Sequence, residues 1–215
     1  MSRIGQRVYG SHGGERKWIS TRIKGNTGKI LSFGCGPLAP LSSELAKCGF
    51  EVTGIDLLPC KIEDIPQNLH YIQTDIMDVK FETRYFDYIV NCSSLEHAGL
   101  AERYGGKDNL DQDLQIMQLF KKILKQDGLQ FLTIPVGIEA VISPWHRVYG
   151  KKRLSQIFEG WQIIGKEFWT FGFHQGQHWY RVTEKDALRE VPRIEPPFLT
   201  AKGLYVLKIE KENND

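Results

Sequence analysis

The sequence lacks several features that would place a protein in a class at once. No stretch approaches the roughly 20 apolar residues of a membrane span, and the first residues contain no apolar core of signal-peptide length. The four cysteines show no CxxC spacing, which argues against a zinc ribbon or a disulfide framework. The formal net charge is only +2, whereas a nucleic-acid-binding domain is expected to be strongly basic. These absences predict a cytoplasmic protein with reduced thiols and no membrane span, and they argue against a nucleic-acid partner.

Length and composition indicate one globular domain. The chain has 215 residues, and a division into two domains would leave each half with a thin core. We therefore expect residues 1–215 to form a single domain. Within it, the glycine-rich, basic segment 1–28 is expected to cover the ligand, and segment 138–200 is expected to form the rim on the substrate side.

From Lys29 onward, short apolar runs alternate with helical patterns. Near-continuous apolar strands separated by helices are typical of a parallel sheet that is covered on both faces. The sequence predicts an α/β, Rossmann-like, doubly wound sheet of seven mostly parallel strands, with the last two strands at an antiparallel edge and the ligand at the carboxyl ends of the strands. The expected strands are 29–33, 51–56, 69–74, 85–92, 129–135, 161–168 and 204–209, and the expected helices are 41–47, a long one that Asp108 caps and Gly128 ends, and 154–158.

A glycine-rich turn and two acids stand at the ends of the first three predicted strands. The turn Gly34-Cys35-Gly36-Pro37 follows the first strand, and glycine lets a ligand approach the backbone because it has no Cβ. Asp56 ends the second strand, roughly 20 residues after the glycine turn. A carboxylate at this spacing can accept hydrogen bonds from the ribose hydroxyls of a nucleoside. Asp75, with Ile76 beside it, follows the third strand and is expected to reach the adenine. The turn GCGPL lacks the GxGxxG pattern of nicotinamide-dependent dehydrogenases, so that class is not favoured.

These segments resemble a known family. The run ILSFGCGPLAPLSSELAKCGFEVTGIDLLP is similar to the opening of class I S-adenosylmethionine-dependent methyltransferases, FDYIVNCSSLEHAG resembles their fourth strand and the turn after it, and DGLQFLTIP resembles their fifth strand. The resemblance covers roughly residues 29–135 and implies S-adenosylmethionine as the cofactor. It departs from the family at Ser32, where an acid is usual, and at Leu38, where a further glycine is usual. The cofactor-binding residues that we expect are Gly34, Cys35, Gly36, Pro37, Asp56, Leu57, Asp75, Ile76 and Ser93.

A narrower resemblance concerns the runs EHAGLAERYG, IPVG and HRVYG. They resemble a methyltransferase-like group, mostly of unassigned function, of which some members occur alongside surface-glycan enzymes. The implied acceptor is a sugar or a glycan precursor.

The turn after the fourth predicted strand carries two of the three candidate catalytic residues. Methyl transfer to a hydroxyl group requires loss of a proton, and an imidazole suits that role at neutral pH. His97 is the first candidate base, with Glu96 and His146 as further catalytic candidates. The alternative is that this turn only shapes the cofactor pocket.

Polar and aromatic residues after this turn and on the expected rim are candidates for binding the acceptor. They are Arg103, Tyr104, Trp145, Arg147, His174 and His178. Asp111 and Asp113 lie in the same region, and together with Glu96 and His97 they are conceivable metal ligands. Their spacing is not diagnostic of a metal site, so we expect no metal.

The sequence therefore predicts an enzyme that transfers a methyl group from S-adenosylmethionine to an oxygen or nitrogen of a small polar acceptor. Two alternatives stay open. A nucleic-acid methyltransferase is the first, although the fourth strand ends in Asn91-Cys92-Ser93-Ser94 rather than in the Pro-Pro-aromatic motif that holds a flipped base. A non-catalytic scaffold that kept the fold is the second, since a fold alone does not establish activity.

Overall fold

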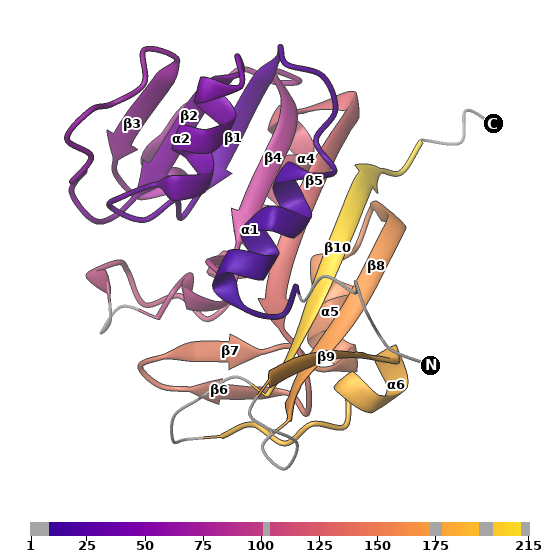
Figure 1. Ribbon diagram of the computed structural model, residues 1–215. Helices are drawn as coiled ribbons and strands as arrows, with labels where there is room; N and C mark the ends of the chain where they lie inside the picture. Colours follow the sequence, from indigo (N-terminus) through magenta and orange to yellow (C-terminus); the bar gives the residue numbers. More distant parts are fainter. Residues whose placement is uncertain (1–8, 101–103, 173–177, 194–199, 212–215) are drawn as a thin grey trace, which may run out of the picture.

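The computed structural model describes residues 9–100, 104–172, 178–193 and 200–211. An eight-stranded sheet with helices on both faces forms the body of the protein (Figure 1). The strands of the large sheet are β1 (Lys29–Phe33), β2 (Glu51–Asp56), β3 (Leu69–Gln73), β4 (Phe86–Cys92), β5 (Leu124–Pro135), β8 (Trp161–Gly172), β9 (His178–Val182) and β10 (Ala201–Ile209). The helices are α1 (His12–Ser20), α2 (Pro40–Lys47), α4 (Gln112–Ile123), α5 (Lys151–Ile157) and α6 (Glu184–Ala187), with the 3-10 turns η1 (Ile76–Asp78) and η2 (Leu95–His97).

The strands lie in the order β3-β2-β1-β4-β5-β10-β8-β9. The pairs among the first five are parallel, whereas β10 runs antiparallel to both β5 and β8. The predicted α/β class, the mostly parallel sheet and its antiparallel side are confirmed. The predicted count of seven strands is wrong, because His178–Val182, expected to be part of a rim, forms β9 at the edge of the sheet. The small hairpin of β6 (Ala140–Ile142) and β7 (His146–Val148) was also not predicted.

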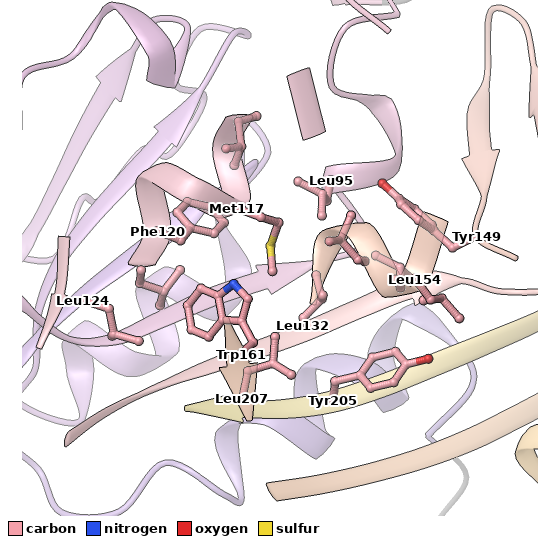
Figure 2. Close-up of a cluster of buried hydrophobic side chains, with 14 of the residues drawn as sticks. Leu95, Met117, Phe120, Leu124, Leu132, Tyr149, Leu154, Trp161, Tyr205 and Leu207 are labelled. Carbon is pink, nitrogen blue, oxygen red and sulfur yellow. The ribbon is translucent and has the colours of Figure 1, made fainter. Parts of the chain in front are cut away.

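Adjacent residues of the central strands pack on opposite faces of the sheet, as the alternation of a strand requires. On one face, α1 and α2 cover a cluster that contains Ile30 of β1 and Val90 of β4. On the other face, α4 and α5 cover a larger cluster that contains the next residue of β1, Leu31. Figure 2 shows part of this second cluster, with Phe120 and Met117 of α4 packed near Trp161 of β8. Burial on both faces explains why these strands are almost continuously apolar.

The ends of α4 differ from the prediction. The helix begins at Gln112, so Asp108 does not cap it, and the residue at its N-cap position is Asp111. It ends at Ile123, and Leu124 already starts β5. Gly128 is therefore a strand residue rather than the glycine after a helix, and a Cβ there would lie 2.7 Å from Leu124 Cδ1. The glycine is needed for close packing inside the strand.

The parallel strands end together at one edge of the sheet, where the turn after β1, η1 and η2 meet. The β6–β7 hairpin lies toward the same edge, which is the lower edge in Figure 1. This arrangement brings segments that are far apart in the sequence around one site. In the described part of the chain, no helix is both long and apolar enough to cross a membrane.

Candidate active site

A pocket of about 280 Å³ opens at the carboxyl ends of β1, β2, β3 and β4. Its volume is close to the lower end of the range of small-molecule sites, about 300–1,000 Å³. All nine residues that the sequence predicted to bind the cofactor lie in its lining. Residues from strands distant in the sequence therefore converge as the prediction required.

The glycine turn forms one wall of the pocket. Gly34 and Gly36 have φ angles of +60° and +73°, in the left-handed region that favours glycine. A Cβ on Gly34 would lie 2.3 Å from the Cβ of Ser94, whose hydroxyl donates a hydrogen bond of 2.9 Å to the Gly34 carbonyl. A Cβ on Gly36 would meet nothing within 4 Å. The first glycine is thus required for packing, and the second keeps the space beside the turn free.

Two carboxylates, those of Asp56 and Asp75, line the pocket next to the glycine turn. Asp56 Oδ2 accepts a hydrogen bond of 2.7 Å from the Gly36 amide, and Oδ1 accepts one of 2.9 Å from the Leu58 amide. These bonds orient the carboxylate and tie it to the glycine turn. Asp75 caps η1 by accepting from the Met77 amide at 2.9 Å, and Gln112 of α4 donates to its Oδ2 at 3.0 Å.

Cys35 lies in the same wall as a neutral thiol. Burial raises the pKa of the Cys35 thiol to about 12, and the negative charge of Asp56 acts in the same direction. A thiol with such a pKa is protonated near neutral pH and is a poor nucleophile. The residue therefore shapes the pocket and does not attack a substrate.

The turn after β4 forms a further wall of the pocket. The buried Asn91 side chain accepts hydrogen bonds of 3.3 Å from the amides of Ser94 and Leu95, which holds the start of η2. Ser93, which lines the pocket, has a φ of +51°. For a residue other than glycine this conformation is strained, and such strain is concentrated at functional sites.

His97 lines the pocket from η2, and its ring is held in one orientation. Its Nδ1 lies 2.5 Å from the carbonyl oxygen of Trp145. Because a carbonyl only accepts hydrogen bonds, Nδ1 carries the hydrogen and Nε2 carries the lone pair. Nε2 lies 3.9 Å from Glu96 Oε1, and the ring of Tyr104, which also lines the pocket, packs edge-on at 5.2 Å.

The remaining predicted catalytic and substrate residues are placed differently. Glu96, His146 and Arg147 are buried and are not in the pocket lining, although the two histidine rings, His97 and His146, are 6.4 Å apart. Arg147 donates to the carbonyl oxygens of Ala98 and Leu110, so its guanidinium holds the backbone around the site. His178 is an exposed residue of β9, away from the pocket. Arg103 and His174 lie outside the described residues.

Asp111 and Asp113 both bind Arg153 of α5. Asp113 is fully buried and accepts from Arg153, while Asp111 Oδ1 lies 2.9 Å from Arg153 Nη1. Burial works to lower the pKa of Arg153, but its hydrogen bonds with Asp113 and Asp111 outweigh this effect and raise it. The two aspartates therefore join α4 to α5. Within the described ranges, no group of three or more His, Cys, Asp or Glu side chains is arranged to hold a metal ion.

Sequence reasoning missed three polar residues in the pocket lining, Thr74, Ser94 and Gln112. Ser94 directly follows the predicted Ser93, so adjacency was a usable signal. Gln112 had no such signal, because its contact with Asp75 depends on how α4 packs against η1. Leu38, the departure that replaces a usual glycine, is 63% exposed and is not in the lining. It therefore leaves the pocket open.

Comparison with solved structures defines the class of fold. The chain is similar to the Burkholderia thailandensis 1,6-didemethyltoxoflavin-N1-methyltransferase, solved with bound 1,6-didemethyltoxoflavin and S-adenosylhomocysteine, with a TM-score of 0.62 and 13% identity over 94% of this chain and 79% of that one. It is similar to a TehB-like S-adenosylmethionine-dependent methyltransferase from Corynebacterium glutamicum (TM-score 0.52, 19% identity, 91% and 87% covered) and to a methyltransferase from Methanosarcina mazei (0.59, 13%, 91% and 98%). The protein thus has the fold of the class I S-adenosylmethionine-dependent methyltransferases.

A family model also matches the chain. Residues 54–175 match DUF268, described as a Caenorhabditis protein of unknown function. The match spans more than half of the chain, which belongs to the DUF268 family. No curated protein matches the chain.

Proposed function

We propose that the protein binds S-adenosylmethionine in this pocket and transfers its methyl group to an oxygen or nitrogen of a small polar acceptor. The observation that carries the proposal is the convergence of the glycine turn, Asp56 and Asp75 on one pocket. In the proposed complex, Gly34 and Gly36 adjoin the amino-acid part of the cofactor. Asp56 accepts from the ribose hydroxyls, and Asp75 binds the adenine edge.

The residues present fit this cofactor. The free space beside Gly36 admits a ligand close to the backbone. The Asp56 carboxylate is already oriented by two backbone amides, so little conformational freedom is lost when it accepts further hydrogen bonds. When bound, S-adenosylmethionine supplies an electrophilic methyl carbon on a positively charged sulfur.

We assign to His97 the removal of the acceptor's proton. The Trp145 carbonyl fixes the tautomer that leaves a lone pair on Nε2, which is the atom that takes up the proton. The imidazolium that forms is stabilised by the Glu96 carboxylate at 3.9 Å. Much of the remaining acceleration is expected from holding the acceptor oxygen in line with the methyl group.

We further propose that the acceptor is a sugar or a glycan precursor. Tyr104 lines the pocket, and an aromatic ring packs well on the apolar face of a sugar. The resemblance of EHAGLAERYG and HRVYG to a methyltransferase-like group with members near surface-glycan enzymes supports the same class.

The cofactor part of the proposal is tested by calorimetric titration with S-adenosylmethionine and S-adenosylhomocysteine. We expect both to bind the wild type, and Asp56→Ala to lose about 1–3 kcal/mol of binding free energy, the cost of lost hydrogen bonds to a charged group. The control is Asp127→Ala, which replaces an aspartate with 86% side-chain exposure near the start of β5, at the opposite end of the strand from the pocket edge. Equal affinities of the two variants would contradict the assignment.

The catalytic part is tested by measuring release of S-adenosylhomocysteine with a panel of free and nucleotide-linked sugars. His97→Asn keeps a donor for the Trp145 carbonyl but removes the base, so we expect kcat to fall about 10²–10⁴-fold with little change in cofactor affinity. His70→Asn, at an exposed position of β3, is the matched control. Unchanged turnover in His97→Asn would remove the residue from the mechanism.

A further inference from the structure

A buried ion pair lies next to the pocket wall and was not predicted from the sequence. Glu15 of α1 and Lys202 of β10 are 0% and 1% exposed, and the Lys202 ammonium contacts Glu15 Oε1 directly. Burying two charges is costly and is tolerated only where they are paired and hydrogen-bonded. This pair is therefore either a structural clamp or a part of the site.

The pair is connected to the pocket through the side chains of Ser93 and Cys92. The Cys92 thiol, which also lines the pocket, donates to Glu15 Oε2 at 3.6 Å. Ser93, which lines the pocket, donates a hydrogen bond of 2.6 Å from Oγ to Glu15 Oε2. Thr133 of β5 donates to the same oxygen at 2.9 Å. Lys202 Nζ lies 3.5 Å from Ser93 Oγ. One layer of side chains thus separates both charges from the pocket.

The charge of Lys202 shifts the pKa of a neighbouring histidine. It is the largest cause that lowers the pKa of His12 to about 4, followed by burial and by the charge of Arg16. Burial lowers the pKa of Lys202 itself to about 7, while the adjacent Glu15 carboxylate favours the charged form. Trp179 of β9 lies over the ammonium at 5.5 Å.

The wall formed by β1 offers no charge of its own. Ser32 stands where the methyltransferase resemblance leads one to expect an acid, and its buried hydroxyl is hydrogen-bonded to Ser42 at 2.9 Å. In the sheet, Ser32 is paired with Val90 of β4, and Glu15 reaches Ser93 just beyond the end of that strand. A carboxylate is therefore present near the end of the neighbouring strand, supplied by α1.

We infer that Glu15 is the countercharge for the sulfonium group of S-adenosylmethionine, and that Lys202 holds Glu15 as a competing cation. The inference rests on the proposed function. It predicts that the two partners of one ion pair act on ligand binding in opposite directions, because Glu15 attracts a positive ligand and Lys202 repels it. A purely structural clamp would be weakened in the same way by loss of either partner.

Comparison of two ligands isolates the charge effect from all other contacts. S-adenosylmethionine carries one more positive charge, at sulfur, than S-adenosylhomocysteine. We therefore measure the ratio of the two affinities in Glu15→Gln and Lys202→Met. The ratio is expected to shift against S-adenosylmethionine in Glu15→Gln and in its favour in Lys202→Met, by about tenfold each for charges several ångströms apart.

The matched controls are Glu184→Gln and Lys166→Met, which remove the partners of an exposed ion pair of 2.6 Å and should leave the ratio unchanged. If a variant does not fold, the inference can still be tested by measuring proton release on the wild type. Titrations in two buffers of different ionisation enthalpy count the protons released on binding. More protons should be released at pH 7 with S-adenosylmethionine than with S-adenosylhomocysteine, because the added charge drives deprotonation of Lys202.

An unchanged ratio in both variants, a shift in the same direction in both, or equal proton counts for the two ligands would overturn the inference and leave the proposed function standing. Failure of the wild type to bind either ligand would overturn both. Opposite shifts, with both variants less stable to heat than the wild type, would support the inference.

Discussion

Replacing Gly34 with alanine tests how tightly the turn after β1 is built. The new methyl group meets two costs. A φ of +60° costs an L-residue about 1–2 kcal/mol, and the Cβ would lie 2.3 Å from Ser94 Cβ and 2.4 Å from Ser94 Oγ. Overpacking of this kind costs about 1–3 kcal/mol. We expect Gly34→Ala to lose about 2–5 kcal/mol of unfolding free energy.

Gly36→Ala is the matched control for this substitution. Its φ of +73° imposes the same backbone cost, but its Cβ meets nothing within 4 Å. We therefore expect a loss of about 1–2 kcal/mol. The difference between the two variants is the part that contact with Ser94 causes.

A double-mutant cycle measures that part directly. Ser94→Gly removes the Cβ that the alanine would strike, so in this background Gly34→Ala should cost no more than Gly36→Ala does in the wild type. Urea unfolding followed by tryptophan fluorescence gives each free energy. Equal costs of Gly34→Ala and Gly36→Ala in the wild type would refute the reasoning, as would an unchanged cost of Gly34→Ala in the Ser94→Gly background.

Two further predictions concern the contacts that join α4 to α5 and the reactivity of the cysteines. Asp113→Asn removes the fully buried carboxylate that Arg153 binds and should cost about 3–5 kcal/mol of unfolding free energy; Asp111→Asn, which removes the 65%-exposed partner of the same arginine, should cost about 0–1 kcal/mol in the same urea titration. Iodoacetamide should alkylate the exposed Cys48 first and Cys35 far more slowly, since the pKa of Cys35 is raised to about 12. Mass spectrometry of peptides over time follows the order, and faster labelling of Cys35 would contradict the burial that we describe.

The first half of the fold was readable from the sequence because its signals are local. The bounds of β1 and β2 were predicted as observed, since the apolar run of β1 ends at a glycine turn and that of β2 ends at an acid. The residues on the proposed nucleoside side of the pocket followed from the same signals. Its residues lie at strand ends, and parallel strands end at one edge of a sheet.

The second half of the fold depends on contacts that no local sequence pattern predicts. The expected end of α4 was wrong because β5 starts directly at Leu124, without a glycine between helix and strand. β9 was missed because its sequence, HWYRV, reads equally well as an aromatic rim. The contact between Glu15 and Lys202 joins the two ends of the chain, so only the folded structure reveals it.

A crystal structure of the protein with S-adenosylhomocysteine tests the central claim most directly. The account predicts the ligand in the pocket between the glycine turn and η2, with both ribose hydroxyls within hydrogen-bonding distance of Asp56 and the adenine beside Asp75. Density for the ligand elsewhere on the molecule, or an empty pocket at a saturating ligand concentration, would contradict it.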